Sequence, residues 1–119
     1  KKVDLNKDGR KEILIEGSTF GLCNMRGNCE FWVFEKVGKK YKQILYHEWT
    51  FSYKISHRFT NGYANIEVNA NSSNGNPSHY LHIHKFNQKS YKLKKCFSVY
   101  EFFYDDKSKN PKKVPEKCE

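Results

Sequence analysis

The sequence has few of the residues that build helices, and it has no long apolar run. Only six of its 119 residues are leucine and two are alanine, which are among the strongest helix formers. The longest apolar runs, Ile13–Ile15 and Phe31–Phe34, fall far below the roughly 20 residues of a membrane-spanning helix. These absences argue against a helical bundle, a coiled coil and a helical membrane span. The mass of 14.2 kDa leaves room for one domain and argues against a multidomain enzyme.

The sequence also lacks the common catalytic motifs. It contains no G-x-S-x-G elbow, phosphate-binding loop, H-E-x-x-H motif or paired acidic motif, so no catalytic residue is assigned. We therefore expect a protein that works by binding. A secreted basic ribonuclease, or another nucleic-acid-directed effector, remains the alternative, and it would need two histidines and a lysine to converge. An inhibitor of a hydrolase such as lysozyme is disfavoured, because two basic proteins repel each other.

Aromatic residues are plentiful at 16%, and apolar and polar residues alternate along most of the chain. Both features favour β-strands, and turn formers such as Asp8-Gly9 and Asn61-Gly62 separate the alternating runs. The sequence predicts an all-β fold of about seven short antiparallel strands in two small packed sheets. Two propeller-blade-like units would give this arrangement. The predicted strands are Glu12–Glu16, Glu30–Val37, Tyr41–Trp49, Tyr53–Phe59, Tyr63–Asn69, Tyr80–Phe86 and Tyr91–Phe103, the last broken near Cys96.

Residues 1–104 are predicted to form this single domain, and residues 105–119 a Lys/Pro-rich tail. A weak internal repeat relates residues 8–42 to residues 61–92. In detail, Asp8–Ile15 resembles Asn61–Val68 at a shift of 53, and Phe31–Phe34 resembles Leu81–His84 at a shift of 50. Repeats of about 50 residues occur in propeller blades, although two copies cannot close a propeller. Two packed sheets, each containing a turn, a strand and a hairpin, are expected; chance likeness between hairpins is the alternative.

Four cysteines in so short a chain indicate two disulfides and an oxidising compartment. Of the three possible connectivities we favour Cys23–Cys29, which encloses a short loop with a glycine, and Cys96–Cys118, which would pin the tail. A zinc site built from all four cysteines is disfavoured, because no Cys-x2-Cys pair is present. We expect the chain to begin after a cleaved leader and the protein to be periplasmic or secreted.

Positive charge is in excess, with 22 Lys plus Arg against 13 Asp plus Glu and a net charge of +9. Lysines crowd two predicted hairpins and are interleaved with aromatic residues, as in a face that binds anions. The alternative is that these lysines only guard solvated strand edges. The candidate anion-binding residues are Lys39, Lys40, Lys42, Lys92, Lys94 and Lys95. No nucleic-acid-binding module is recognisable, so we expect the partner to be another protein or an anionic cell-envelope ligand.

The run Asp4-Leu5-Asn6-Lys7-Asp8-Gly9-Arg10-Lys11-Glu12, followed by Ile13–Ile15, resembles the D-x-N-x-D-G-x-x-E-hydrophobic signature of FG-GAP/VCBS-type repeats. These repeats are familiar from integrin-like propellers. Together with the Cys23–Cys29 loop and Trp32–Phe34, the run resembles small exported bacterial proteins that are mostly uncharacterised. The resemblance covers roughly residues 3–97 and provides no established catalytic residue.

The same acidic run is a candidate calcium loop, because Ca²⁺ takes oxygen ligands from alternate residues around a glycine turn. Its ligands would be the side chains of Asp4, Asn6 and Asp8, the carbonyl of Arg10, and Glu12. Calcium is the one cofactor that the pattern indicates. The alternative is an Asx turn in which the same side chains cap backbone amides without a metal.

Histidines form a second group of candidate metal ligands. His82 and His84, close to His79, lie two residues apart on a predicted strand and therefore share a face. Their equivalents in the repeat, Trp32 and Phe34, favour a packing role over zinc or copper binding. His47 and His57 have no partner that the sequence identifies.

Overall fold

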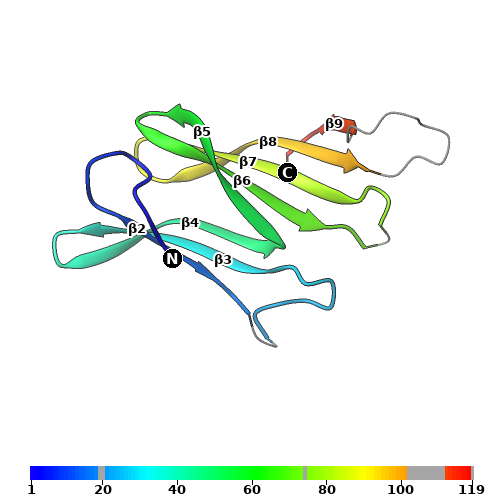
Figure 1. Ribbon diagram of the computed structural model, residues 1–119, viewed down its shortest axis with the longest axis horizontal. Coiled ribbons are helices and arrows are strands. Elements are labelled where there is room, and N and C mark those ends of the chain that lie inside the picture. The colour runs from blue at the N-terminus through cyan, green and yellow to red at the C-terminus, as the bar shows by residue number, and fades with distance from the viewer. Residues whose placement is uncertain (19–20, 74, 102–111, 119) are drawn as a thin grey trace.

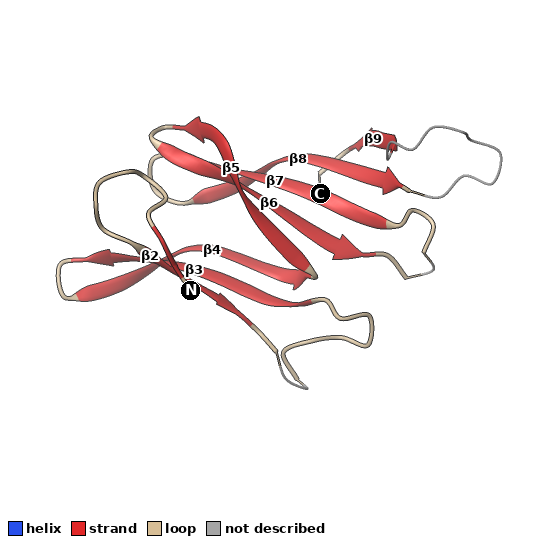
Figure 2. Cartoon of the chain, in the orientation of Figure 1, coloured by secondary structure: helices blue, strands red, loops and turns tan. Residues whose placement is uncertain are grey.

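The computed structural model describes residues 1–18, 21–73, 75–101 and 112–118, and in this part of the chain nine antiparallel strands form two sheets without any helix (Figure 2). The prediction of an all-β fold with two packed sheets is confirmed. The strands are β1 (Lys2–Val3), β2 (Glu12–Glu16), β3 (Cys29–Val37), β4 (Lys40–Thr50), β5 (Ser52–Thr60), β6 (Tyr63–Asn71), β7 (His79–Phe86), β8 (Tyr91–Tyr100) and β9 (Lys112–Glu116). The described residues accordingly contain no helix that could cross a membrane.

Each strand pairs with the next along the chain, except where the chain changes sheets. The first sheet has the order β1-β2-β3-β4 and the second β5-β6-β7-β8-β9 (Figure 1). Phe51 alone separates β4 from β5, and its backbone N–H donates to the Asn69 carbonyl at 2.6 Å. The single-residue link forces the chain to leave one sheet and enter the other within one turn.

Two strands were not predicted, and one predicted break is wrong. β1 has only two residues and β9 is fully exposed, so neither shows an alternating pattern; pairing with a neighbouring strand forms both. β8 runs unbroken through Cys96, although a bulge leaves Lys94 without a partner on β7. The predicted end of this strand at Phe103, like residues 105–111 of the predicted tail, lies outside the described residues.

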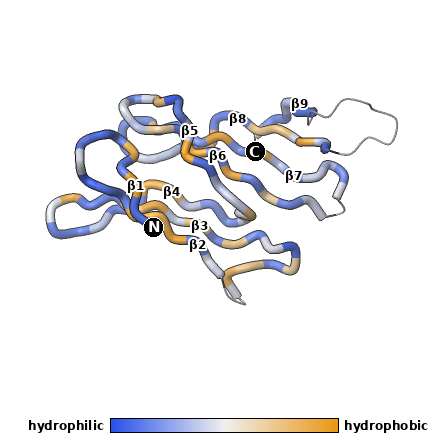
Figure 3. The backbone as a smooth tube through the Cα atoms, in the orientation of Figure 1, coloured by the Kyte–Doolittle hydropathy of each residue, from blue (hydrophilic) through white to orange (hydrophobic). Residues whose placement is uncertain are grey.

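One apolar core lies between the sheets. Eleven buried side chains from both sheets and the β1–β2 connection form a single cluster, and Figure 3 shows hydrophobic segments on the facing strands. Phe31 of β3 stacks on Tyr53 of β5, with ring centroids 4.6 Å apart. Neither sheet can bury its apolar face alone, so the sheets stabilise each other. The cluster contains Leu5, Leu14, Phe31, Val33, Ile44, Leu45, Ala64, Ile66, Val68, Phe86 and Tyr91.

The two halves of the chain share one pairing register. Ile13 pairs with Phe34 between β2 and β3, and Ile66 pairs with His84 between β6 and β7. These pairs differ by the same shifts of 53 and 50 residues that relate the two halves in sequence. Both hairpins also carry a register shift at the equivalent point, after Val33 in β3 and after Ile83 in β7. The repeated sequence units thus have the same strand order and the same irregularity.

The two units turn opposite faces toward the core. Val33 is buried and its equivalent Ile83 is only half-buried, whereas His84 is buried and its equivalent Phe34 is half-buried. When two copies of one unit stack in the same orientation, as consecutive propeller blades do, the upper face of one copy packs on the lower face of the other. The two copies therefore bury opposite faces. This stacking explains why a histidine lies in the core where the other unit has an aromatic residue near the surface.

Both predicted disulfides are present, Cys23–Cys29 and Cys96–Cys118, and the chain has no free cysteine. Two disulfides are typical of an oxidising, extracytoplasmic environment. The first one closes a loop that is fastened to the second sheet through Asn28, whose side chain is buried. The Asn28 amide donates to the Asn71 carbonyl at 3.0 Å and accepts from the Asn71 N–H at 2.7 Å. The loop therefore ties the two sheets together at one end.

Candidate functional site

Three histidines point into the space between the sheets. His47 of β4 pairs with the core residue Phe31, so both side chains lie on the inner face of the first sheet. His82 and His84 of β7 pair with the core residues Val68 and Ile66 and share the inner face of the second sheet. The stacking of the sheets brings together side chains that are 35 and 37 positions apart in sequence.

The three imidazole rings are in contact. His47 Nε2 lies 3.0 Å from His82 Nδ1, and the other nitrogen of His47 lies 3.1 Å from the Thr50 hydroxyl. The ring centroid of His47 lies 5.2 Å from that of His82 and 5.3 Å from that of His84. His84 is only 4% exposed, and among the described residues neither of its ring nitrogens has a hydrogen-bond partner. Thr50 thus orients His47, whereas His84 is a buried polar group without compensation.

Burial keeps all three histidines neutral. Desolvation, with a smaller contribution from the neighbouring His82, lowers the pKa of His47 from 6.5 to about 4. Desolvation, reinforced by His47 and His82, lowers the pKa of His84 to about 3, and desolvation also lowers the pKa of His82. Neutral imidazole can accept a proton or ligate a metal ion, but it cannot donate a proton as imidazolium does.

A cleft of about 590 Å³ opens beside the histidines, between edge strand β4 of the first sheet and strands β7 and β8 of the second. The residues that line the cleft include His47, His82 and His84, the exposed Trp49, and Lys92 of β8. A second cleft of about 510 Å³ lies between the disulfide loop and the same His47–His82 pair, and Arg26 and Tyr80 contribute to its walls. The pair therefore borders two solvent-accessible hollows that are lined by aromatic and cationic side chains.

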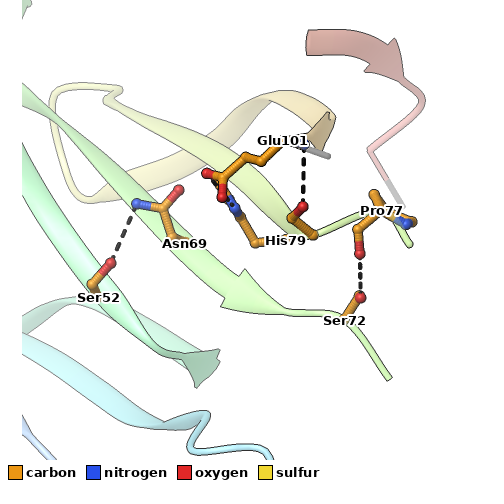
Figure 4. A network of polar contacts seen from close by, with 7 residues as sticks. Ser52, Asn69, Ser72, Pro77, His79 and Glu101 are labelled. Carbon is orange, nitrogen blue, oxygen red and sulfur yellow. Dashed lines mark hydrogen bonds and ion pairs between the residues drawn. The ribbon is translucent and has the colours of Figure 1, made fainter. Parts of the chain in front are cut away.

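His79 does not join the three inner histidines. Its Nδ1 lies 3.6 Å from the carboxylate of Glu101. The backbone N–H of Glu101 donates to the Ser78 hydroxyl at 3.1 Å. Figure 4 shows these contacts beside the bond from the Asn69 amide to the Ser52 hydroxyl, 3.4 Å long. The same view includes the Ser72 hydroxyl, which donates to the Pro77 carbonyl. We interpret this polar group as a set of contacts that holds strand ends together.

The candidate calcium loop has its carboxylates turned toward amides. Asp4 accepts from the N–H groups of Asp8 at 3.3 Å and Gly9 at 2.9 Å, and Asp8 accepts from the N–H of Arg10 at 2.8 Å. The bond from Arg10 is the main reason that the pKa of Asp8 is lowered. Asn6 donates to Asp8 at 3.1 Å. Gly9 adopts a φ of +87°, which favours glycine. This is the arrangement of an Asx-turn cluster.

Glu12, the fifth candidate ligand, lies beneath this loop. It is 2% exposed and accepts the Leu5 N–H at 2.7 Å. Burial raises its pKa, and the Leu5 bond partly opposes this shift. One Glu12 oxygen is therefore already engaged in supporting the loop from below.

Calcium binding at this loop stays a prediction with a small expected effect. For a site with a dissociation constant of roughly 10⁻⁴–10⁻³ M, about 1 mM Ca²⁺ should add only about 0.4–1.4 kcal/mol to the free energy of unfolding. Thermal melting in calcium against EDTA measures this gain. Asp8→Asn keeps a hydrogen-bond acceptor for the Arg10 N–H and removes the charge, so the calcium response should vanish while the loop persists. Equal melting temperatures of the parent protein in both buffers would leave only the Asx turn.

The six candidate lysines are all exposed, and within the described residues none of them forms an ion pair. Lys42 of β4 donates from Nζ to the Lys89 carbonyl at 2.9 Å. Because Lys89 lies in the β7–β8 turn, this bond joins the tips of the two lysine-rich hairpins. Lys39 and Lys40 lie at the first of these tips, Lys92 begins the return strand of the second, and Lys94 and Lys95 follow farther along β8.

Sequence reasoning missed His47 and Thr50. Both lie in a predicted strand, but nothing in the sequence specifies which strand of the other sheet will face them. Only the alternation that puts Leu45 and His47 on one face of β4 gave a partial signal. Comparison of the chain with family models, with curated proteins and with solved structures finds no match.

Proposed function

We propose that this chain is a non-enzymatic binding module, periplasmic or secreted, that takes an anionic ligand of the cell envelope at its joined lysine-rich hairpin tips. The observation that carries the proposal is the Lys42–Lys89 bond, because it joins two lysine-rich hairpin tips at one end of the sandwich, where no candidate lysine forms an ion pair with another described residue. Unpaired surface cations raise the local positive potential and attract anionic polymers. The two disulfides support an extracytoplasmic location.

The common register of the two halves supports the proposed relation to FG-GAP/VCBS-type repeats. Each half contributes one turn, one strand and one hairpin in the same order, which is what a duplicated blade-like unit requires. In this interpretation the hairpin tips are equivalent points of two copies. Their lysines therefore face the same ligand because the units stack in parallel.

The test of anion binding compares two triple variants with the same net charge. In Lys39→Gln/Lys42→Gln/Lys92→Gln the substituted residues belong to the hairpins, and in Lys11→Gln/Lys54→Gln/Lys113→Gln they lie elsewhere on the surface. With purified lipopolysaccharide as the probe at about 50 mM salt, we expect at least a tenfold loss of affinity for the first variant. The second should lose less than threefold. Equal losses would mean that only net charge matters, and absence of binding by the parent protein would end the proposal.

A ribonuclease is the second candidate, and the approach of His47 to His82 beside Lys92 is the observation in its favour. Acid–base cleavage needs one histidine to donate a proton, and burial opposes the protonated form of both. Labelled RNA incubated with the protein in EDTA separates the candidates. Cleavage that is lost in His82→Ala would make the protein an enzyme. We expect salt-sensitive binding of the polyanion without cleavage.

A further inference from the structure

We propose that His47, His82 and His84 form a binding site for a late transition-metal ion, Zn²⁺ or Cu²⁺, between the two sheets. The inference is independent of the anion-binding function, because it rests on the inner faces of β4 and β7 and not on the hairpin tips. Imidazole nitrogens are preferred ligands of both ions.

The first argument is the distance between two potential ligand atoms. His47 Nε2 and His82 Nδ1 are 3.0 Å apart. Two nitrogens that bind Zn²⁺ with bonds of about 2.0–2.1 Å in tetrahedral geometry are about 3.3 Å apart. The ion could therefore replace the proton that this pair shares if the two nitrogens moved apart by only a few tenths of an ångström.

The second argument is His84. Burying an imidazole with neither nitrogen bonded costs free energy that a phenylalanine at this position would not cost. The equivalent position of the first unit is in fact Phe34. A metal ion between the rings would give His84 a partner and account for a histidine that packing alone does not require.

The third argument is the surroundings of the pair. Thr50 contacts His47 Nδ1 at 3.1 Å, and if its hydroxyl accepts the Nδ1 proton, the Nε2 lone pair is directed toward His82. The adjoining cleft would admit the ion and leave a coordination position for water or an exogenous ligand. The neutral state of the three imidazoles, which burial enforces, is the state that ligates metal.

Among the described residues, no three His, Cys, Asp or Glu side chains already stand in coordinating geometry. The His47–His82 pair is thus the preformed part of the site, and the ring of His84 has to turn about its side-chain bonds to complete it. We therefore expect binding of micromolar strength, with His84 contributing through a third bond.

The test uses the full chain, freed of metal with EDTA and dialysed, and titrated with Zn²⁺ by calorimetry at pH 7.5. We expect one Zn²⁺ per chain, and an affinity at least tenfold lower in His84→Phe and in His82→Phe. His57→Gln, at an exposed residue of β5, is the matched control and should bind as the parent does, whereas Asp8→Asn tests the acidic loop as a competing metal site. Circular dichroism checks that each variant is folded, and His47→Gln replaces any variant that is not.

Electron paramagnetic resonance of the Cu²⁺-loaded protein provides an independent readout, with hyperfine structure from imidazole nitrogens that is lost in His84→Phe or His82→Phe. The proposal is overturned if the parent protein binds no Zn²⁺ at 100 μM, or if folded variants of the three histidines bind as the parent does. Loss of binding in Asp8→Asn alone would assign the metal to the acidic loop instead. We expect His84→Phe to bind lipopolysaccharide as the parent does. This result would show that the metal site and the anion-binding function can fail independently.

Discussion

Lowering the pH from 7 to 4.5 should reduce the free energy of unfolding by roughly 2–4 kcal/mol, because the inner histidines are held neutral in the folded protein. An unfolded histidine titrates near pH 6.5, whereas burial lowers the pKa of His47 to about 4 and that of His84 to about 3. Between these values the unfolded chain binds more protons than the folded chain. Stability is therefore fully present above pH 6.5 and is lost as the pH falls.

The magnitude follows from the same two residues. At pH 4.5 each independent histidine would cost up to about 2.7 kcal/mol, since one pKa unit corresponds to about 1.4 kcal/mol. The expected sum is smaller because the histidines interact and because Glu12 has the opposite effect. Its raised pKa makes the folded state the better proton binder above pH 4.5, so acidification relieves the cost of burying its charge.

Urea unfolding at several pH values between 7.5 and 4.5, in EDTA, measures this dependence. The double variant His47→Gln/His84→Phe should show a distinctly shallower loss of stability on acidification, whatever its stability at pH 7.5. The control His57→Gln changes an exposed histidine of β5 and should retain the parent slope. Parallel curves for the double variant and the parent would show that the inner histidines do not govern acid stability.

Removing the Cys96–Cys118 disulfide should cost about 3 kcal/mol and release β9 from β8. The bridge closes a loop of 23 residues, for which chain entropy alone gives about 3.4 kcal/mol. β9 has five exposed residues and contributes none to the described core cluster, so we expect the nearby bridge to be important for its pairing with β8. Without the bridge, β8 becomes the edge of the second sheet.

Cys96→Ala/Cys118→Ala tests this expectation by denaturant unfolding and by hydrogen exchange. The N–H groups of β9 and of the facing stretch Cys96–Tyr100 should lose protection, while β6 keeps it. Cys23→Ala/Cys29→Ala is the matched variant, for which a seven-residue loop gives only about 2.4 kcal/mol. Full protection of β9 in the first variant would mean that strand pairing alone is sufficient.

Local pattern accounts for most of the fold. The alternation in β2–β7 identifies the strands within one or two residues at each end, because side chains on a strand have a period of two. Turn formers such as Asn61-Gly62 mark where a strand must end. The pattern fails at β9, where every residue is exposed and only pairing with β8 produces a strand.

The candidate site divides in the same way. Spacing in the sequence places His82 and His84 on one face of a strand, and composition with cysteine spacing indicates both disulfides. The shared face follows from the close spacing of the two histidines, and four cysteines allow only three disulfide connectivities. For the acidic loop, short-range spacing indicated a calcium loop with an Asx turn as the alternative; the contacts with the Asp8, Gly9 and Arg10 amides are those of the Asx turn, and calcium binding stays a prediction.

Which residues meet across the core depends on how the two sheets stack. The single-residue turn at Phe51 leads from the first sheet into the second, and the sheets stack so that opposite faces of two similar units come together. That stacking brings His47 to His82 and buries His84, although the equivalent Phe34 stays near the surface. Alternation determines the two faces of each strand, but the choice of inward face is a property of the packed pair of sheets, because only their joint burial removes apolar surface from water.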